Sequence, residues 1–236
     1  MPKPLEGQHV LVVGASSGMG RGVALHAAEA GARLTLMGRD AGRLEAVAAE
    51  TGGEIRTIDL RREETVPLAV EGLADVDHLV VTAGTYGVHP VAKSRPSDWR
   101  EILEERLIGP LFLIKSLGSR LTRSITLFTG STVRRPTAGA VLPTAALGGV
   151  EAMVRALAVE LAPVRANAVS PGIVDTPLLD TVLGSAKAEV VKASRESLPA
   201  RHVGTPDDAA SAAMFLMTNP FVTGTTIELD GGGTLV

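Results

Sequence analysis

Short apolar runs alternate with longer segments in which apolar residues recur every three or four positions. The short runs predict buried strands, and the longer amphipathic segments predict helices. The predicted strands are His9–Val13, Arg33–Met37, Ile55–Leu60, His78–Ala83, Ser124–Phe128, Val164–Val169 and Thr225–Leu229. The predicted helices are Gly18–Ala30, a helix through Leu44, Val47 and Ala48, then Val66–Leu73, Trp99–Leu117, Val150–Leu161 and a last helix ending at Met217. Regular alternation of strand and helix indicates an α/β fold with a doubly wound parallel sheet of about seven strands and helices on both faces.

Two of these helices have clear starting signals. Asp40 precedes the second helix and is suited to cap it. The run Thr205-Pro206-Asp207-Asp208 combines a capping threonine, a proline at the first helical position and an acidic residue in the first turn. No repeat, low-complexity tract or linker interrupts the pattern. We therefore expect residues 1–236 to form a single domain.

Composition narrows the choice of function. The core is aliphatic, because hydrophobic residues make up 45% of the 236 residues and aromatic residues only 3%. A formal charge of −3 gives no reason to expect nucleic acid or a membrane surface as a partner. The chain has no cysteine, which excludes disulfides and thiol chemistry, and no metal site is predicted. The N-terminal segment is polar, so a cytoplasmic location is the expectation.

A glycine-rich turn follows the first predicted strand. It reads Gly14-Ala15-Ser16-Ser17-Gly18-Met19-Gly20 and leads into a helix. Glycines in this context let the backbone turn tightly and approach a ligand, and the helix N-terminus attracts a pyrophosphate. The turn therefore predicts a dinucleotide site of the Rossmann type, with a purely structural turn as the alternative.

Arg39 follows the second strand, where an acidic residue would bind the ribose hydroxyls of NAD. A guanidinium at this position suits a 2′-phosphate, so the sequence favours NADP(H). The alternative is a solvated arginine at the start of a helix.

The chain resembles the short-chain dehydrogenase/reductase family over essentially its whole length. The resemblance rests on the glycine-rich turn and on Ile58-Asp59-Leu60, Thr82-Ala83-Gly84, Asn167-Ala168-Val169-Ser170-Pro171-Gly172, Thr176, Thr223-Gly224 and Asp230-Gly231-Gly232. It implies that Asp59 and Leu60 contact the adenine and that Ala83 and Gly84 line the dinucleotide. It also implies that the segment from Pro171 to Thr176 closes on the nicotinamide, with Pro171, Gly172 and Thr176 as cofactor-binding residues. Residues Leu178 to Leu198 would form a mobile substrate lid with Val182, Leu183, Ala186 and Val190 facing the pocket.

The family's catalytic residues do not match. Relatives use a tyrosine as general acid, a lysine four residues later, a serine and an asparagine. Aligned on the flanking motifs, Pro143 stands at the tyrosine position, Leu147 at the lysine, Gly130 at the serine and Arg106 at the asparagine. The one tyrosine of the chain is Tyr86, and no lysine occurs between Lys115 and Lys187.

Other groups at the carboxyl edge of the sheet could replace them. Tyr86 and His89 follow the fourth strand, Ser131 follows the fifth, and Arg106 would place a cation beside the pocket. We interpret Arg106, Ser131 and Tyr86 as a rebuilt site. Each of the three also has an ordinary structural explanation, as a surface charge, a turn residue and a packed loop residue.

Two functions remain open. One is an NADP(H)-dependent oxidoreductase with a divergent mechanism, acting on a small carbonyl or alcohol. The other is a non-catalytic NADP(H)-binding sensor or partner subunit, indicated by the loss of all four catalytic groups. The resemblance also implies a homo-oligomer, a dimer or tetramer, in which helices Trp99–Leu117 and Val150–Leu161 pair across a two-fold axis. Candidate contact residues are Leu111, Leu113, Val154, Leu157 and Leu161.

Overall fold

The computed structural model describes residues 3–85, 87 and 90–236. All seven of its strands form one parallel sheet in the order β3-β2-β1-β4-β5-β6-β7. The strands are β1 (His9–Val13), β2 (Arg33–Gly38), β3 (Glu54–Thr57), β4 (Val76–Val81), β5 (Leu121–Phe128), β6 (Arg165–Pro171) and β7 (Thr226–Leu229). The predicted fold class is therefore confirmed. Every residue of β1 is buried, as expected for a strand covered on both faces.

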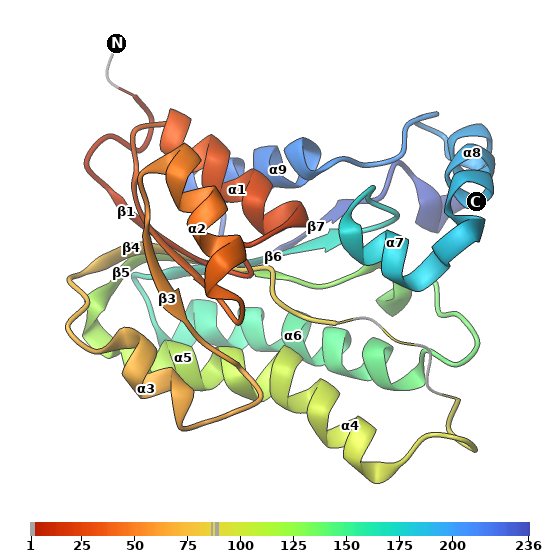
Figure 1. Cartoon of the computed structure of the whole chain (residues 1–236), viewed down its shortest axis with the longest axis horizontal. Helices are drawn as coiled ribbons and strands as arrows, with labels where there is room; N and C mark the ends of the chain where they lie inside the picture. The colour runs from red at the N-terminus through yellow and green to blue at the C-terminus, as the bar shows by residue number, and fades with distance from the viewer. Residues whose placement is uncertain (1–2, 86, 88–89) are drawn as a thin grey trace.

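Helices cover both faces of this sheet (Figure 1). One face carries α1 (Gly18–Glu29), α2 (Ala41–Thr51) and α9 (Pro206–Thr218). The other carries α3 (Thr65–Val70), α5 (Gly109–Leu117) and α6 (Val141–Glu160). The helices on each face pack against the sheet through a separate hydrophobic cluster. The sheet is therefore packed between two cores.

The strand order reverses between β1 and β4, because the chain first builds outward through β2 and β3 and then crosses back. A crevice opens at such a reversal, outside the carboxyl ends of the strands. Two short helices, α7 (Pro177–Leu183) and α8 (Lys187–Ser197), follow β6 beyond this edge. A 3₁₀ turn, η4 (Gly184–Ala186), joins them. The fold thus places a ligand site between the glycine-rich turn and α7.

Both predicted helix caps are present. The Asp40 carboxylate accepts a hydrogen bond from the Arg43 amide at 3.1 Å. The Thr205 hydroxyl accepts from the Asp208 amide at 3.2 Å, and the Asp208 carboxylate accepts from the Thr205 amide at 2.8 Å. These are reciprocal capping-box bonds.

The predicted helix Trp99–Leu117 is helical throughout, but it begins at Pro96 and includes one π turn. The segment consists of α4 (Pro96–Leu103), a π-helical turn η1 (Glu104–Ile108) and α5. The wider turn coincides with a tight approach between two backbones. A side chain at Gly109, the residue after η1, would collide with the carbonyl oxygen of Leu60. The chain accommodates this contact by widening one helical turn.

Two other predicted boundaries are corrected. Strand β3 ends at Thr57, so Asp59 and Leu60 lie in the following turn, where the Asp59 amide bonds the Thr65 hydroxyl at 3.1 Å. Helix α6 begins at Val141 rather than Val150, since Pro143 falls in its first turn and costs no helical hydrogen bond. The segment Leu178 to Leu198, predicted to form a lid, consists largely of α7 and α8, and the lid stays a prediction.

The proposed oligomer contacts divide into two groups. Leu113, Val154 and Leu157 are buried inside the chain, so packing within the chain explains their apolar character. Leu111 is 43% exposed, and Leu161 is partly buried against the core. Of the described helices, α6 alone is long and apolar enough to cross a membrane. It contributes Val154 and Leu157 to the core, and core helices of folded domains commonly meet the same criterion.

Candidate functional site

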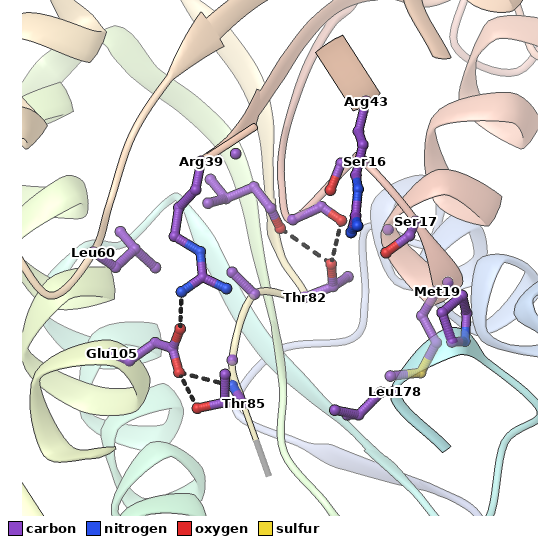
Figure 2. A pocket seen from close by; sticks show the side chains of 18 of the residues that line it. Ser16, Ser17, Met19, Arg39, Arg43, Leu60, Thr82, Thr85, Glu105 and Leu178 are labelled. Atoms are coloured by element: carbon purple, nitrogen blue, oxygen red, sulfur yellow. Dashed lines mark hydrogen bonds and ion pairs between the residues drawn. The ribbon is translucent and has the colours of Figure 1, made fainter. Parts of the chain in front are cut away.

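A cavity of about 360 Å³ lies at the carboxyl ends of β1, β2 and β4, and we call it the first cavity (Figure 2). Its lining consists of Val13, Gly14, Ser16, Ser17, Gly18, Met19, Gly20, Gly38, Arg39, Arg43, Ile58, Asp59, Leu60, Thr82, Ala83, Gly84, Thr85, Glu105, Thr176, Pro177, Leu178 and Thr181. It therefore includes every predicted cofactor-binding residue except Pro171 and Gly172.

The glycines of the turn are required by close contacts. Gly14 has a φ of +88°, and a Cβ there would lie 2.6 Å from the Thr82 hydroxyl oxygen. A Cβ on Gly20 would collide with the carbonyl of Gly14 and lie 2.5 Å from the same hydroxyl. That hydroxyl donates to the carbonyls of Val13 at 3.1 Å and Gly14 at 3.4 Å (Figure 2). The glycine-rich turn is therefore held against Thr82, at the end of β4, by these hydrogen bonds and close contacts.

The start of α1 is open toward a ligand. Ser17 is the N-cap residue, but its side chain makes no capping hydrogen bond. The first-turn N–H groups have no helical partners, and they carry the positive end of the helix dipole. Together with the glycine turn they form a cradle that fits a pyrophosphate. The residues present thus fit the predicted dinucleotide.

Two guanidiniums stand at the far end of the first cavity. Arg39 follows β2, and Arg43 lies one turn into α2. Arg43 pairs with Asp40 at 3.4 Å, while Arg39 extends toward Glu105, with 3.9 Å between Nη1 and Oε1 (Figure 2). Two arginines at this end of a dinucleotide site are suited to a phosphate on the adenosine ribose.

Glu105 is a buried carboxylate that faces the first cavity from η1. Its side chain is 6% exposed, and its Oε2 accepts hydrogen bonds from the Thr85 amide and hydroxyl, both at 2.7 Å. The carboxylate therefore fixes the loop that follows β4. No local signal in the sequence identifies Glu105, because its partners are distant in sequence.

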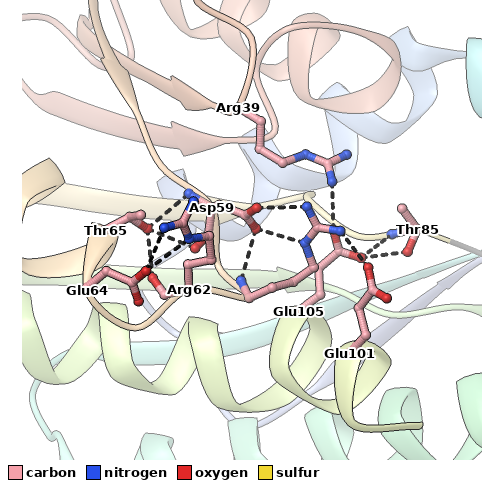
Figure 3. A network of polar contacts seen from close by, with 9 residues as sticks. Arg39, Asp59, Arg62, Glu64, Thr65, Thr85, Glu101 and Glu105 are labelled. Atoms are coloured by element: carbon pink, nitrogen blue, oxygen red, sulfur yellow. Dashed lines mark hydrogen bonds and ion pairs between the residues drawn. The ribbon is translucent and has the colours of Figure 1, made fainter. Parts of the chain in front are cut away.

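Asp59 belongs to a network of polar contacts that is drawn together with Arg39, Thr85 and Glu105 in Figure 3. Arg61 donates to both carboxylate oxygens, at 2.9 and 2.7 Å, and also to Glu101 at 2.5 Å. The hydrogen bonds from Arg61 are the main reason that the pKa of Asp59 is lowered. Asp59 is thus held as an anion beside the first cavity, with its backbone anchored by Thr65.

A second cavity of about 490 Å³ adjoins the first. Residues of the first cavity that also border it are Met19, Thr82, Gly84, Thr176 and Leu178. Its other lining residues are Arg106, Phe128, Thr129, Gly130, Ser131, Thr132, Thr137, Leu147, Pro171, Gly172, Ile173, Val174, Leu179, Val182, Leu183 and Val190. A mainly apolar cavity of this size is typical of a small-molecule site. Two compartments therefore meet at a shared wall.

The structure brings Arg106 and Ser131 together in the second cavity. Arg106 donates to the Thr85 carbonyl from Nε at 3.2 Å and from Nη2 at 2.8 Å. Its guanidinium covers Gly84, where any Cβ would collide with it. Burial lowers the pKa of Arg106. Tyr86 and His89 lie outside the described residues.

The positions of the missing catalytic groups differ from one another. Leu147 and Gly130 line the second cavity, whereas Pro143 is buried in the first turn of α6. Of the predicted lid residues, Val182, Leu183 and Val190 line the cavity and Ala186 does not. Pro171 and Gly172 face the second cavity rather than the first, because they lie at the end of β6, two strands beyond β4.

Comparisons with known proteins agree with this arrangement. A family model described as enoyl-(acyl carrier protein) reductase matches residues 14–234. The short-chain dehydrogenase/reductase ATR9 of Stachybotrys chlorohalonatus is 31% identical over 250 residues, covering 98% of this chain and 98% of its own.

Solved structures show the same fold. MalC reductase/Diels-Alderase from Malbranchea aurantiaca superposes with a TM-score of 0.93 at 28% identity, covering 100% of this chain and 99% of its own. A small-chain dehydrogenase in complex with NADPH gives a TM-score of 0.84 at 26% identity, with 98% and 100% coverage.

Proposed function

Because the chain belongs to the short-chain dehydrogenase/reductase family, we propose that it is an NADP(H)-dependent oxidoreductase with a non-standard active site. Its substrate is a small carbonyl compound or the corresponding alcohol. The first cavity holds the cofactor and the second holds the substrate. The observation that carries the proposal is that the two cavities adjoin and share lining residues. This arrangement would place the nicotinamide end of the cofactor next to the substrate.

The choice of NADP(H) rests on Arg39 and Arg43. Both line the first cavity and neither lines the second, and the described lining of the first cavity contains no carboxylate from the end of β2. A 2′-phosphate supplies the charge and the acceptor oxygens that these guanidiniums can bind. The related structure in complex with NADPH supports the same assignment.

The nicotinamide supplies hydride transfer when it is bound. In this proposal Pro143 and Leu147 replace the tyrosine and lysine of the family, so the chain must handle the substrate oxygen differently. Ser131 is suited to hydrogen-bond that oxygen, since its hydroxyl makes no hydrogen bond to the described residues. Arg106 provides positive charge in the same cavity. Tyr86 remains a third candidate.

The cofactor assignment is tested by titrating the purified protein with NADPH and NADH. We expect NADPH to bind at least tenfold more tightly, and Arg39→Gln to remove most of that preference. Equal affinities in the unchanged protein would contradict it. NADH serves as the internal control, because both nucleotides share the pyrophosphate and nicotinamide.

The activity is tested by screening aldehydes, ketones and quinones with NADPH, following absorbance at the nicotinamide band. Turnover above background is expected. Tight NADPH binding without turnover would instead favour a non-catalytic sensor or partner subunit.

We also propose a cytoplasmic homo-oligomer. Ile108 and Leu111 are 46% and 43% exposed and lie three residues apart on η1 and α5. Light scattering on the purified protein tests the assembly, and a monomer at micromolar concentration would contradict it.

A further inference from the structure

Arg106 is the one charged side chain among the described residues that line the second cavity. Its guanidinium has five N–H groups, and the two recorded bonds both go to one neutral acceptor, the Thr85 carbonyl. No carboxylate of the described chain lies within ion-pair distance of it. The remaining N–H groups are therefore available to a ligand.

The neighbouring carboxylate does not neutralise this charge by contact. Glu105 is adjacent in sequence, but its oxygens bond Thr85 and approach Arg39 in the first cavity. The π turn places the two consecutive side chains on different cavities. The structure thus separates a buried carboxylate on the cofactor side from a guanidinium on the substrate side that pairs with no carboxylate of the described residues.

An arginine keeps its proton even where burial disfavours the charge, as it does for Arg106. A partly buried cation without a partner ion is costly, and an anionic ligand offsets that cost. A planar guanidinium binds a carboxylate with two parallel hydrogen bonds. The rest of the cavity is suited to hydrocarbon, since Leu179, Val182, Leu183 and Val190 form one wall.

We propose that the substrate of the second cavity is an apolar molecule that bears a carboxylate, and that Arg106 pairs with this carboxylate. This inference rests on the proposed function only in calling the ligand a substrate. Binding of a carboxylate to Arg106 does not require turnover. A sugar would leave the aliphatic wall unused. An amine would meet a like charge.

The test compares octanoate with octanamide, which has the same chain length but no charge. Each is titrated calorimetrically into the protein, with and without saturating NADPH. We expect octanoate to bind at least tenfold more tightly than octanamide. In Arg106→Gln the octanoate dissociation constant should rise at least tenfold, while that of octanamide stays within about twofold.

Two further variants make the outcome specific. Arg106→Lys keeps the charge but loses the planar pair of donors, so it should retain part of the preference. Arg100→Gln removes an exposed arginine from the preceding helix and should leave both dissociation constants unchanged. Thermal unfolding of each variant establishes that it is folded.

Equal binding of octanoate and octanamide, no octanoate binding, or an unchanged octanoate affinity in Arg106→Gln would overturn the inference. Failure of NADPH to bind would contradict the proposed function instead. The titrations without cofactor would still report on Arg106.

Discussion

Glu105 and Arg39 approach each other within the first cavity, with 3.9 Å between Oε1 and Nη1. The acid is buried and fixed by Thr85, whereas the Arg39 side chain is 50% exposed. The guanidinium assigned to the cofactor phosphate therefore has an internal competitor. Binding of a phosphate at Arg39 must exchange one anionic partner for another.

Replacing Glu105 by glutamine should strengthen NADPH binding. The amide oxygen of glutamine can still accept the hydrogen bonds from Thr85, but it offers Arg39 no charge. We expect the NADPH dissociation constant to fall about twofold to fivefold, which corresponds to roughly 0.4–1 kcal/mol and lies within the range measured for partly exposed ion pairs. The NADH dissociation constant should not change. Fluorescence titration measures both, and weaker NADPH binding would show that Glu105 supports the phosphate site instead.

Two glycines on α1 form a matched pair. Gly20→Ala places a methyl group against Gly14 and Thr82, and Gly22→Ala places one 2.7 Å from the Pro206 carbonyl oxygen. Both should lower the free energy of unfolding, by about 1–3 kcal/mol. Gly20→Ala alone should weaken NADPH binding, because it displaces the cofactor turn. Urea unfolding and NADPH titration separate the two effects; a similar loss of affinity in Gly22→Ala would contradict the prediction.

Ser131→Ala should reduce turnover without affecting cofactor binding. Ser131 lines the second cavity only, and its hydroxyl is assigned to the substrate oxygen. We expect kcat to fall about 10²-fold with any carbonyl substrate found in the screen, while the NADPH dissociation constant is unchanged. Ser131→Thr keeps a hydroxyl and should retain most of the activity. An unchanged kcat in Ser131→Ala would remove Ser131 from the site.

His78 should make the fold sensitive to acid. It is 1% exposed and bonds Ser124 and Gln8, each at 2.7 Å, and burial lowers its pKa from 6.5 to about 4. Between these values the unfolded chain binds a proton that the folded chain does not, so stability falls as the pH falls through this window. The loss between pH 7.5 and pH 5 amounts to about 2 kcal/mol.

Urea unfolding at the two pH values measures this loss. His78→Gln should remove most of it and leave the smaller contribution of His9, whose pKa burial also lowers. The same pH dependence in the variant would exclude His78 as its source.

Local signals in the sequence were sufficient for much of the fold. The bounds of β1 and the caps at Asp40 and Thr205 depend on a few neighbouring residues, and all three predictions are confirmed. The positions of Arg39 and the glycine turn followed from their places at strand ends. The structure puts both in one cavity.

Features that depend on distant contacts were not predictable. The π turn at Glu104–Ile108 accompanies the close contact between Gly109 and the carbonyl of Leu60, a residue far away in the sequence. The role of Glu105 depends on its contacts with Thr85 and Arg39, which lie in other parts of the chain. No periodicity of its own helix indicates either partner.

Met19, Thr82, Gly84, Thr176 and Leu178 border both cavities. A ligand in one compartment therefore touches side chains that also form the surface of the other. If binding in one cavity shifts these residues, the two binding equilibria are linked, and the factor by which cofactor changes substrate affinity equals the factor by which substrate changes cofactor affinity. We therefore expect that a replacement in this wall that alters the affinity for the ligand of one cavity also alters the affinity for the ligand of the other.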